Sequence, residues 1–245
     1  PSYLPMKKEL DFYECRHGIG YTCICGERNG IRAEETFFVP KNDNCEIHRI
    51  KIINKEDKAK EIKLFSFVEF CLWDAQDDML NFQRNLSTGE VEVENGIIYH
   101  KTEYRERRNH FAFYSVNADV DAFETDRDSF LGQFNGFDSP ESVISGQNKN
   151  SVASGWSPVA SHQINVKLGA NEEKEYIFVL GYIENEKDKK FKETGVINKE
   201  KAYEMIAKFK TSEQCDTALD ELKEYWDELL SIYTVKSNDE SLTEW

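Results

Sequence analysis

Short apolar and aromatic segments at even spacing fill the chain from residue 11 to residue 123, and they limit the possible folds more than any other feature. These segments are rich in β-branched and aromatic residues, are separated by short polar breaks, and lie at 19–27, 31–39, 45–54, 61–73, 90–94, 97–104 and 111–116. No helical period interrupts them. Strands spaced in this way are typical of antiparallel sheets packed as a sandwich.

Two turn signals support the antiparallel arrangement. Residues 90–94 read EVEVE, a strict alternation of charged and apolar side chains, and Asn95-Gly96 follows directly. The pair Asn29-Gly30 gives the same turn signal between the segments 19–27 and 31–39. Because Asn and Gly tolerate positive φ, both pairs predict tight hairpins.

The region 126–161 has a different character from the segments around it. Glycines lie there among serines and asparagines, with few aliphatic residues, which predicts a long surface excursion without regular structure. After it, residues 162–168 alternate cleanly. Residues 175–183 are nearly all apolar, as expected for a central strand that is covered on both faces.

The hydrophobic period becomes helical after Asn198. Apolar residues at 202, 205, 206 and 209 predict a short helix, for which Asn198 is a candidate N-cap. A second helix, capped by Thr211 or Ser212, carries one continuous apolar stripe that consists of Cys215, Leu219, Leu222, Trp226, Leu229 and Tyr233. Such a stripe needs a packing partner. We predict a domain outside these 245 residues as that partner, and packing back on the sandwich is the alternative.

Together these patterns predict a mainly β protein, with a large antiparallel β-sandwich followed by C-terminal linker α-helices. We place the sandwich domain at 1–190 and the helical linker at 191–245. The composition, 39% hydrophobic and 13% aromatic with five prolines, is that of a globular chain. All-β sandwiches of roughly 200–250 residues commonly form one domain.

The charge balance narrows the classes of partner. Lys and Arg number 31 against 46 Asp and Glu, a formal net charge of −15, which repels nucleic acid and anionic membrane surfaces. A neutral ligand such as a sugar is indifferent to that field. The sequence has no apolar run long enough to span a bilayer and no signal segment at its start, so we expect a cytoplasmic protein.

The cysteines indicate packing and not chemistry. Six cysteines lie at 15, 23, 25, 45, 71 and 215, and only Cys23 and Cys25 are close together. One intervening residue is the wrong spacing for redox or zinc motifs, which have two. On a strand the two thiols would share a face, as small packing residues of a reduced protein.

No metal or cofactor site follows from the sequence. The five histidines lack metal-ligand spacing and do not neighbour a hydrolase motif, so a structural role is the better interpretation of each. Phosphate-binding glycine loops of the common types are absent. We therefore predict no metal and no cofactor.

The segment 71–90 has the residue types of a sugar site. Trp73 and Phe82 lie there among amides, carboxylates and one arginine. Aromatic rings cover the apolar C–H faces of sugars, while amides, carboxylates and arginine bind the hydroxyl groups. From residue types alone, a well-capped turn anchored by its two aromatic residues is the better interpretation.

Longer strings of residues favour the sugar site over the well-capped turn. The strings FSFVEFCLW at 65–73, NFQRN at 81–85, STGEVEV at 87–93 and IYHKTEYRERR at 98–108 closely resemble the cellobiose phosphorylases of glycoside hydrolase family 94. ECRHGIGYT at 14–22, GERNG at 26–30 and DSFLG at 128–132 are similar to the same family. The resemblance covers essentially the whole chain, and it is weakest in the excursion and in the last few residues.

The resemblance implies a supersandwich-like N-terminal domain, linker helices and then an (α/α)6 barrel with the catalytic aspartic acid. It implies further strands ahead of Pro1, and it places the general acid beyond Trp245. The 245 residues alone are therefore predicted to be inactive. The family commonly forms homodimers in which a sandwich loop reaches the neighbouring subunit's site.

The reaction implied is inverting phosphorolysis of cellobiose to α-glucose 1-phosphate and glucose. Phosphate is the co-substrate and attacks directly, while one carboxylic acid protonates the leaving oxygen, so a second catalytic carboxylate is not needed. The partners implied are a β-linked disaccharide and phosphate.

Five residues carry the expected substrate contacts. Arg84 is the first candidate, because its planar guanidinium suits sugar hydroxyls or phosphate. Asn81, Gln83 and Asn85 are supporting candidates, and Asp74 departs from the asparagine expected after Leu-Trp in the family. That extra charge puts its own contact and the acceptor-sugar preference in doubt.

Other polar and aromatic residues are interpreted as structural. Arg105, Arg107 and Arg108 lie next to glutamates, which suits cross-strand ion pairs better than phosphate binding. Trp156, in the excursion, is more commonly an anchored loop aromatic than a sugar platform.

Two alternatives stay open. The first is a free-standing carbohydrate-binding sandwich module, which the predicted strands and the aromatic content favour and the unpartnered helix disfavours. The second is the same family with another β-linked disaccharide as substrate, because the pocket that selects the sugar lies mainly downstream of these residues.

Overall fold

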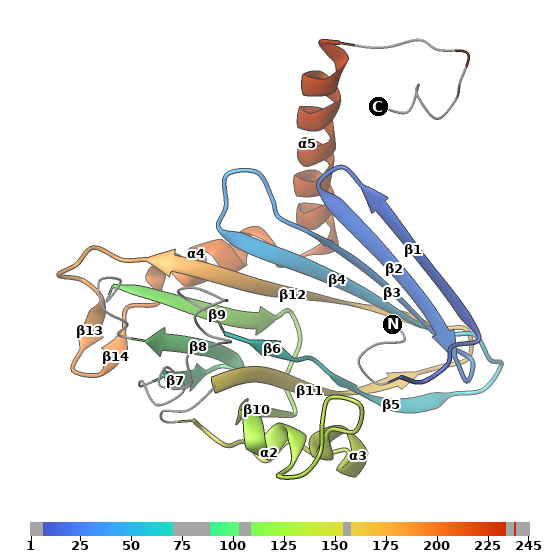
Figure 1. Cartoon of the computed structure of the whole chain (residues 1–245), viewed down its shortest axis with the longest axis horizontal. Helices are drawn as coiled ribbons and strands as arrows, with labels where there is room; N and C mark the ends of the chain where they lie inside the picture. The colour runs from blue at the N-terminus through green and yellow to red at the C-terminus, as the bar shows by residue number, and fades with distance from the viewer. Residues whose placement is uncertain (1–6, 71–88, 103–108, 154–157, 234–237, 239–245) are drawn as a thin grey trace.

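The computed structural model describes residues 7–70, 89–102, 109–153, 158–233 and 238. Two antiparallel sheets pack face to face, and helices lie against the outer side of each sheet (Figure 1). The predicted class, a mainly β antiparallel sandwich followed by C-terminal helices, is confirmed.

In the part of the chain that the structure describes, the larger sheet has eight strands, and every neighbouring pair in it is antiparallel. In spatial order the strands are β1 (Phe12–Gly18), β2 (Tyr21–Arg28), β3 (Ile31–Phe38), β4 (Cys45–Asn54), β12 (Glu173–Glu184), β9 (His110–Val116), β8 (Ile97–Thr102) and β7 (Gly89–Glu94). The nearly all-apolar segment predicted as a central strand is β12, and it lies in the middle of this sheet.

Among the described residues the smaller sheet has four strands, and it packs across one face of the larger sheet (Figure 1). Its order is β10 (Ala122–Asp126), β11 (Pro158–Leu168) and β5 (Lys60–Phe65), and β6 (Val68–Glu69) also pairs with β11. A two-stranded ribbon, β13 (Phe191–Glu193) with β14 (Val196–Ile197), precedes the last two helices.

The first core fills the space between the sheets. Ile98, Tyr114 and Phe178 of the larger sheet face Ile164 and Val166 of the smaller one, and all five are buried. The alternation read from residues 162–168 therefore places its apolar side chains inward, as predicted.

The second core lies between the larger sheet and the helices α4 (Glu200–Lys208) and α5 (Ser212–Ser231). Cys215, Leu219 and Leu222 of α5 are buried against sheet residues such as Ile47 and Val179. The prediction that the whole stripe packs on an outside domain is wrong for this half, because the sheet supplies an apolar face within the same chain.

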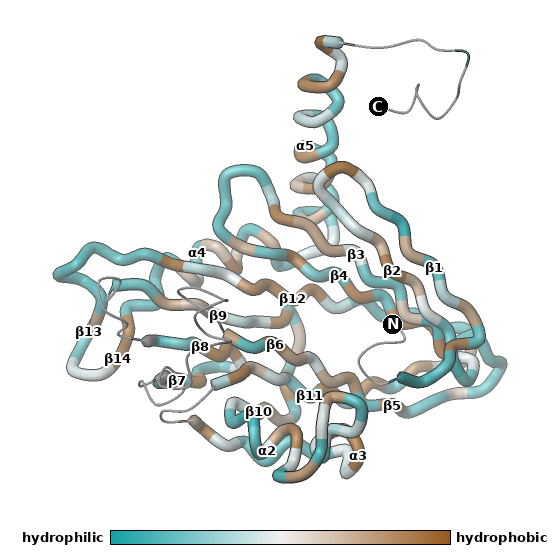
Figure 2. Tube along the Cα trace, viewed as in Figure 1, coloured by the Kyte–Doolittle hydropathy of each residue, from teal (hydrophilic) through white to brown (hydrophobic). Residues whose placement is uncertain are grey.

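The outer half of α5 has a different environment. Leu229 is 43% exposed and Tyr233, just beyond the helix, is 79% exposed. In Figure 2 the helix rises away from the sheets with apolar residues still on it. The stripe is therefore divided, with Trp226 partly buried at the boundary.

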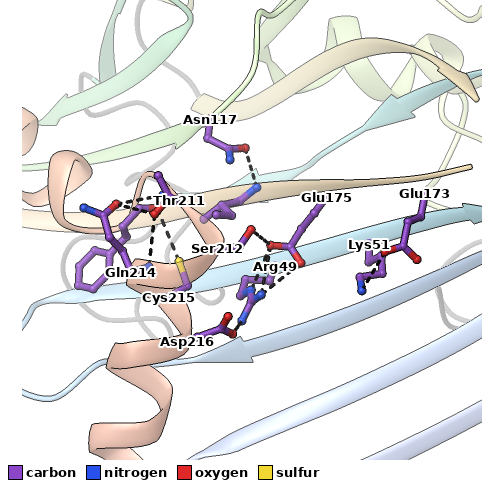
Figure 3. Close-up of polar contacts among 12 residues, drawn as sticks. Arg49, Lys51, Asn117, Glu173, Glu175, Thr211, Ser212, Gln214, Cys215 and Asp216 are labelled. Atoms are coloured by element: carbon purple, nitrogen blue, oxygen red, sulfur yellow. Dashed lines mark hydrogen bonds and ion pairs between the residues drawn. The ribbon is translucent and has the colours of Figure 1, made fainter.

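Polar contacts fix the start of α5 on the sheet (Figure 3). Thr211, one of the two residues predicted to cap this helix, is its N-cap and forms a capping box with Gln214. The guanidinium of Arg49 on β4 pairs with Glu175 at 3.2 Å and with Asp216 of α5. The shorter helix α4 begins differently from the prediction, since Lys199 is its N-cap, although the Asn198 side chain accepts a hydrogen bond from Glu200 N at 3.2 Å.

The first strand was not predicted as a separate segment. Residues 12–18 form β1, and the turn that follows delays the start of β2 to Tyr21 and not residue 19. Gly20 has a φ of 85°, and a Cβ there would lie 3.0 Å from Trp226 Nε1, so the hairpin tip packs closely against α5. Glycine tolerates both the positive φ and the close contact with Trp226. Residues 19 and 20 therefore form a turn, although Ile19 is apolar.

The excursion also contains regular structure. The short helices α2 (Arg127–Leu131) and α3 (Glu141–Ser145) lie in it, and β10 and β11 enter it from either side. The buried Glu124 carboxylate accepts hydrogen bonds from the backbone N–H groups of Thr125, Asp126 and Lys149 at 3.0–3.2 Å. Polar side chains satisfy the backbone here, so hydrophobic periodicity gave no signal.

The predicted hairpin turns are confirmed. Asn29 and Gly30 have φ values of 50° and 67°, and Asn95 and Gly96 have values of 53° and 76°. Positive φ at both positions is the conformation that these residue pairs favour.

Candidate functional site

The predicted substrate residues fall in a segment that the structure does not describe. Arg84, Asn81, Gln83, Asn85 and Asp74 all lie in 71–88, and they stay predictions. Trp156 and the arginines Arg105, Arg107 and Arg108 also lie outside the described residues. A candidate site is therefore built from the strand ends that flank these segments.

Phe70, the residue just before the segment 71–88, contacts His100 of the larger sheet. The Phe70 ring stacks on the imidazole of His100 with 4.9 Å between centroids and 16° between planes. His100 lies on β8, and the strand β7 that leaves the segment pairs with it through Val91. The entry and the exit of 71–88 are therefore held on one patch of the larger sheet.

Within the described part of the chain, His100 is buried with both ring nitrogens unsatisfied. Its exposed fraction is 5%, and neither ring nitrogen has a hydrogen-bond partner among the described residues. Burial lowers the pKa of His100 to about 4, so the ring is neutral at pH 7 and offers one donor and one acceptor. Each unsatisfied buried group costs roughly 1–3 kcal/mol, which favours a partner for these atoms.

His110 stands beside His100 at the start of β9. Because His100 pairs with Ala112, two residues along β9, both imidazoles lie on the sheet face that points to the smaller sheet. Tyr182 contacts the His110 ring edge-on at 5.1 Å, and Glu184 lies 3.4 Å from Nε2. The Nδ1 atom of His110 has no described partner.

We call the set Phe70, His100, His110, Tyr182 and Glu184 the histidine patch. Two imidazoles, two aromatic rings and one carboxylate can donate to and accept from uncharged hydroxyl groups, as a sugar or a loop side chain would require. Among the described residues the patch lacks a cation for phosphate. No sequence pattern marked the patch, because His100 and His110 lie on neighbouring strands and only strand pairing brings them to one face of the sheet.

His162 shows the structural alternative that the sequence predicted for every histidine. Its Nε2 bonds Gly96 O at 2.8 Å, and Ser66 Oγ lies 3.4 Å from Nδ1. Burial lowers the pKa of His162 to about 4, as it does for His100. The difference between the two residues is that His162 has partners at both nitrogens.

An ion-pair network lies on the other face of the larger sheet, where β7 and β8 pair. Glu92 accepts from Lys101 at 2.9 Å, from Lys199 at 2.7 Å and from Ile197 N at 3.0 Å. Burial by itself would raise the pKa of Glu92, but these hydrogen bonds outweigh it and lower the pKa. Both lysines are buried and engaged, so they anchor β14 and α4 and are not free to bind phosphate.

A shallow hollow of about 300 Å³ lies between the β3–β4 loop and the helices. Its charged residues are largely paired, since Lys208 bonds Asp43 at 2.6 Å and the Lys41 ammonium lies 4.3 Å from the centre of the Tyr225 ring. The hollow is a joint between loop and helices. We assign it no ligand.

A family model described as "Glycosyl hydrolase 94, supersandwich domain" matches residues 1–212. The chain belongs to this family. The resemblance read from the strings at 14–30 and 65–108 is thereby confirmed at the level of the family, and the two packed sheets are the supersandwich.

Three curated relatives of this family 94 chain are phosphorylases by name. N,N'-diacetylchitobiose phosphorylase of Vibrio furnissii is 28% identical over 245 residues, which cover 98% of this chain and 29% of the relative. The enzyme of the same name from Vibrio proteolyticus is 29% identical over 244 residues, with 98% and 29% covered. Solabiose phosphorylase of Paenibacillus borealis is 32% identical over 154 residues, which cover 62% of this chain and 20% of the relative. The chain thus spans less than a third of the length of these relatives.

In the described part of the family 94 chain, no group of three or more His, Cys, Asp or Glu side chains is placed to hold a metal ion. Of the helices described, none is long and apolar enough to cross a membrane. Cys15, Cys23, Cys25, Cys45 and Cys215 are free thiols.

Proposed function

We propose that this chain is the supersandwich part of an inverting disaccharide phosphorylase that converts cellobiose and phosphate into α-glucose 1-phosphate and glucose. The family match over residues 1–212 carries the proposal, together with relatives that are phosphorylases by name. Cellobiose is the preferred substrate because of the strings at 65–108, and another β-linked disaccharide is the alternative.

The proposed reaction needs few catalytic groups. A phosphate oxygen forms the new bond to the anomeric carbon while the glycosidic C–O bond breaks, and the leaving sugar oxygen takes a proton from one carboxylic acid. Attack from the opposite face inverts the anomeric centre. We place the acid and most of the phosphate site outside these 245 residues.

The contribution of this chain is a substrate-site segment held by the histidine patch. Arg84, assisted by Asn81, Gln83 and Asn85, is proposed to contact sugar hydroxyls or phosphate, with Asp74 influencing acceptor preference. Phe70 and His100 hold both ends of that segment on one strand pair. A firm base of this kind supports a long loop that must present its side chains accurately.

The outer half of α5 is proposed to contact the catalytic part of the enzyme. Apolar side chains continue past the sheet, where Leu229, Leu230 and Tyr233 are 43%, 46% and 79% exposed. The matched relatives are more than three times as long as the region they share with this chain, so a covering partner within one polypeptide is the natural occupant. We also propose a cytoplasmic homodimer, which the free thiols suit.

The decisive experiment is a phosphorolysis assay with a panel of β-linked disaccharides. The 245-residue chain alone is expected to release no sugar 1-phosphate from cellobiose, N,N'-diacetylchitobiose or solabiose. A fusion in which it replaces the matching 29% of the Vibrio furnissii enzyme is expected to be active, and Arg84→Ala in that fusion to lower kcat/KM by roughly tenfold or more.

Binding separates the proposal from the alternative of a free-standing sugar-binding module. Calorimetry of the isolated chain with cellobiose is expected to show no saturable heat, because most of the proposed site is outside the chain. Tight cellobiose binding by the isolated chain, or turnover by it, would overturn the proposal. Arg28→Ala, at the end of a strand remote in sequence from 71–88, is the matched control for Arg84→Ala.

A further inference from the structure

Residues 185–199 link the strand β12 to the helix α4 and contain the two-stranded ribbon β13–β14 (Figure 1). We call this stretch the arm. It contacts the end of the larger sheet that adjoins the proposed substrate-site segment, since β7 begins at Gly89, directly after 71–88, and pairs there with Thr102 of β8. The polar contacts of the arm reach β7, β8 and the start of β9.

One carboxylate fixes the arm to β7. Glu92 accepts hydrogen bonds from Ile197 N at 3.0 Å and from the ammonium of Lys199 at 2.7 Å. Lys199 also pairs with Glu94 at 2.5 Å. The Glu92 side chain is 15% exposed and that of Lys199 is 7% exposed, so water has little access to these contacts. Charge-assisted hydrogen bonds in such an environment hold both partners in one geometry.

The arm is also bound to β8 and to the start of β9. The Lys101 ammonium of β8 donates to Gly195 O and pairs with Glu92 at 2.9 Å. Just before β9, Asn185 N donates to Asn109 O at 3.1 Å, and Asn109 Nδ2 donates to Asn185 O at 2.5 Å. Both asparagines are buried. The strands β7, β8 and β9 are therefore all tied to one piece of chain.

We propose that the arm positions the substrate-site segment, with Glu92 and Lys199 as positioning residues for the reaction. This inference rests on the function proposed above, in which the segment 71–88 contacts sugar or phosphate. Neither of the two side chains is proposed to touch substrate. Glu92 lies on the sheet face opposite that of His100, because Val91 is the residue that pairs with His100 and neighbouring positions of a strand alternate. Both residues act through β7, which follows the segment directly.

The same contacts connect β7 to the C-terminal helices. Lys199 is the N-cap residue of α4, so the cation that Glu92 binds is fixed at the start of that helix. Tyr203, in the first turns of α4, donates to Glu94 at 2.7 Å. The helix itself packs in the second core through Ala202. Since ion pairs and packed elements carry coupling between distant parts of a protein, a shift of α4 on the sheet would reach the strand that leaves the segment.

Kinetics of the fusion enzyme described above test the proposal. Lys199→Met removes the cation but keeps a side chain of similar length, and it should lower kcat/KM about tenfold because the segment is no longer held accurately. Lys199→Arg keeps the cation and should retain most of the activity. Lys60→Met is the matched control, since Lys60 is 18% exposed and pairs with Glu56 at 2.6 Å but lies on the smaller sheet. It should change kcat/KM by less than about twofold.

A double-mutant cycle separates positioning from a general loss of structure. If Lys199 acts through the segment that carries Arg84, Lys199→Met should have little further effect on kcat/KM in the Arg84→Ala background. A defect spread over the whole fold would instead multiply with the effect of Arg84→Ala. Independent, multiplying effects of the two substitutions would overturn the proposal.

Hydrogen exchange in the 245-residue chain tests the arm without any activity. The amides of β7 and β8 should exchange about tenfold faster in Lys199→Met than in the wild-type chain or in Lys199→Arg. The amides of β2 and β3, which the arm does not contact, should be unchanged and serve as the internal control. Unchanged exchange in β7 and β8 would overturn the role of the arm.

The two experiments distinguish the failure of this inference from the failure of the proposed function. A fusion that is inactive, or indifferent to Arg84→Ala, would contradict the proposed function, whatever the exchange rates of β7 and β8. An active fusion that depends on Arg84 but tolerates Lys199→Met as well as it tolerates Lys60→Met would overturn the positioning role and leave the proposed function standing.

Discussion

The two halves of helix α5 have the same apolar stripe and opposite environments. In the first half Cys215, Leu219 and Leu222 have exposed fractions of 0%, 8% and 7%, while Leu229 beyond them is 43% exposed. The spacing of apolar residues is the same throughout. What differs is whether a sheet lies underneath, so a hydrophobic period predicts that a face will be covered but not by what.

The largest expected effect comes from truncating one side chain in each half. Leu219→Ala should lower the free energy of unfolding by about 2–5 kcal/mol, because it leaves a cavity in the second core. Leu229→Ala is the matched control and should change it by less than about 0.5 kcal/mol. Urea unfolding followed by circular dichroism measures both. Equal losses would mean that the two halves are not distinguished by packing as described.

Removal of the ion pairs beneath the first half should have the next largest effect. Arg49 is 15% exposed and joins Glu175 of the sheet to Asp216 of α5. Arg49→Met should destabilise the chain by about 2–3 kcal/mol, since it leaves a partly buried carboxylate without its cation. Arg16→Met removes a pair that is 74% exposed on the arginine side and should be nearly neutral. If thermal unfolding shifts equally for both, burial does not set the strength of these pairs.

High pH should lower the free energy of unfolding through His48, which lies on the face of the larger sheet that α5 does not cover. Burial alone would lower the pKa of His48, but hydrogen bonds with Glu35 at 2.8 Å and with Glu46 raise it to about 9. Because the folded pKa is raised, the stabilisation is complete below about pH 6.5 and is lost as pH rises to about 9. With the side chain 24% exposed, we expect a loss of about 1–2 kcal/mol across that window.

The measurement for His48 is the free energy of unfolding at about pH 6, 7.5 and 9.5, values that bracket the ordinary and the raised pKa. His48→Gln should flatten the profile between these values. A profile that stays as steep in the variant would assign the pH dependence to other groups.

The smallest of the four effects concerns the cap that starts the covered half of α5. The Thr211 side chain accepts a hydrogen bond from Gln214 N, and the Gln214 side chain accepts one from Thr211 N. Thr211→Ala should cost about 1 kcal/mol, whereas Thr211→Ser should retain most of the stability because it keeps the hydroxyl. Hydrogen exchange at the first turn of α5 should rise in the alanine variant alone. Unchanged exchange there would show that tertiary packing, and not the cap, fixes the start of the helix.

The sequence predicted strands well where two-residue periodicity coincided with turn residues. The strand β4 begins and ends where predicted, and β3 differs by one residue at its end. Prediction failed where other interactions were decisive. The short helices α2 and α3 lie in the region read as an irregular excursion, and β1 ends in a turn whose glycine is required by its contact with Trp226.

The candidate site also has one part that the sequence identified and one part that it did not. Family strings identified the segment 71–88 and its residue Arg84, which lie outside the described residues and stay predictions. The histidine patch was not predicted, because Phe70, His100, His110 and Glu184 are far apart in the sequence and meet only through strand pairing. Spacing along the chain carries no information about such a cluster.

The sequence by itself determined the class of fold, the main strands, the hairpin turns, the two C-terminal helices and the family, because each follows from local periodicity, from turn residues or from specific strings. Only the tertiary structure decided that half of the α5 stripe packs on the chain's own sheet and that two histidines share one face. These are outcomes of long-range pairing, in which a residue's environment is set by strands distant in sequence.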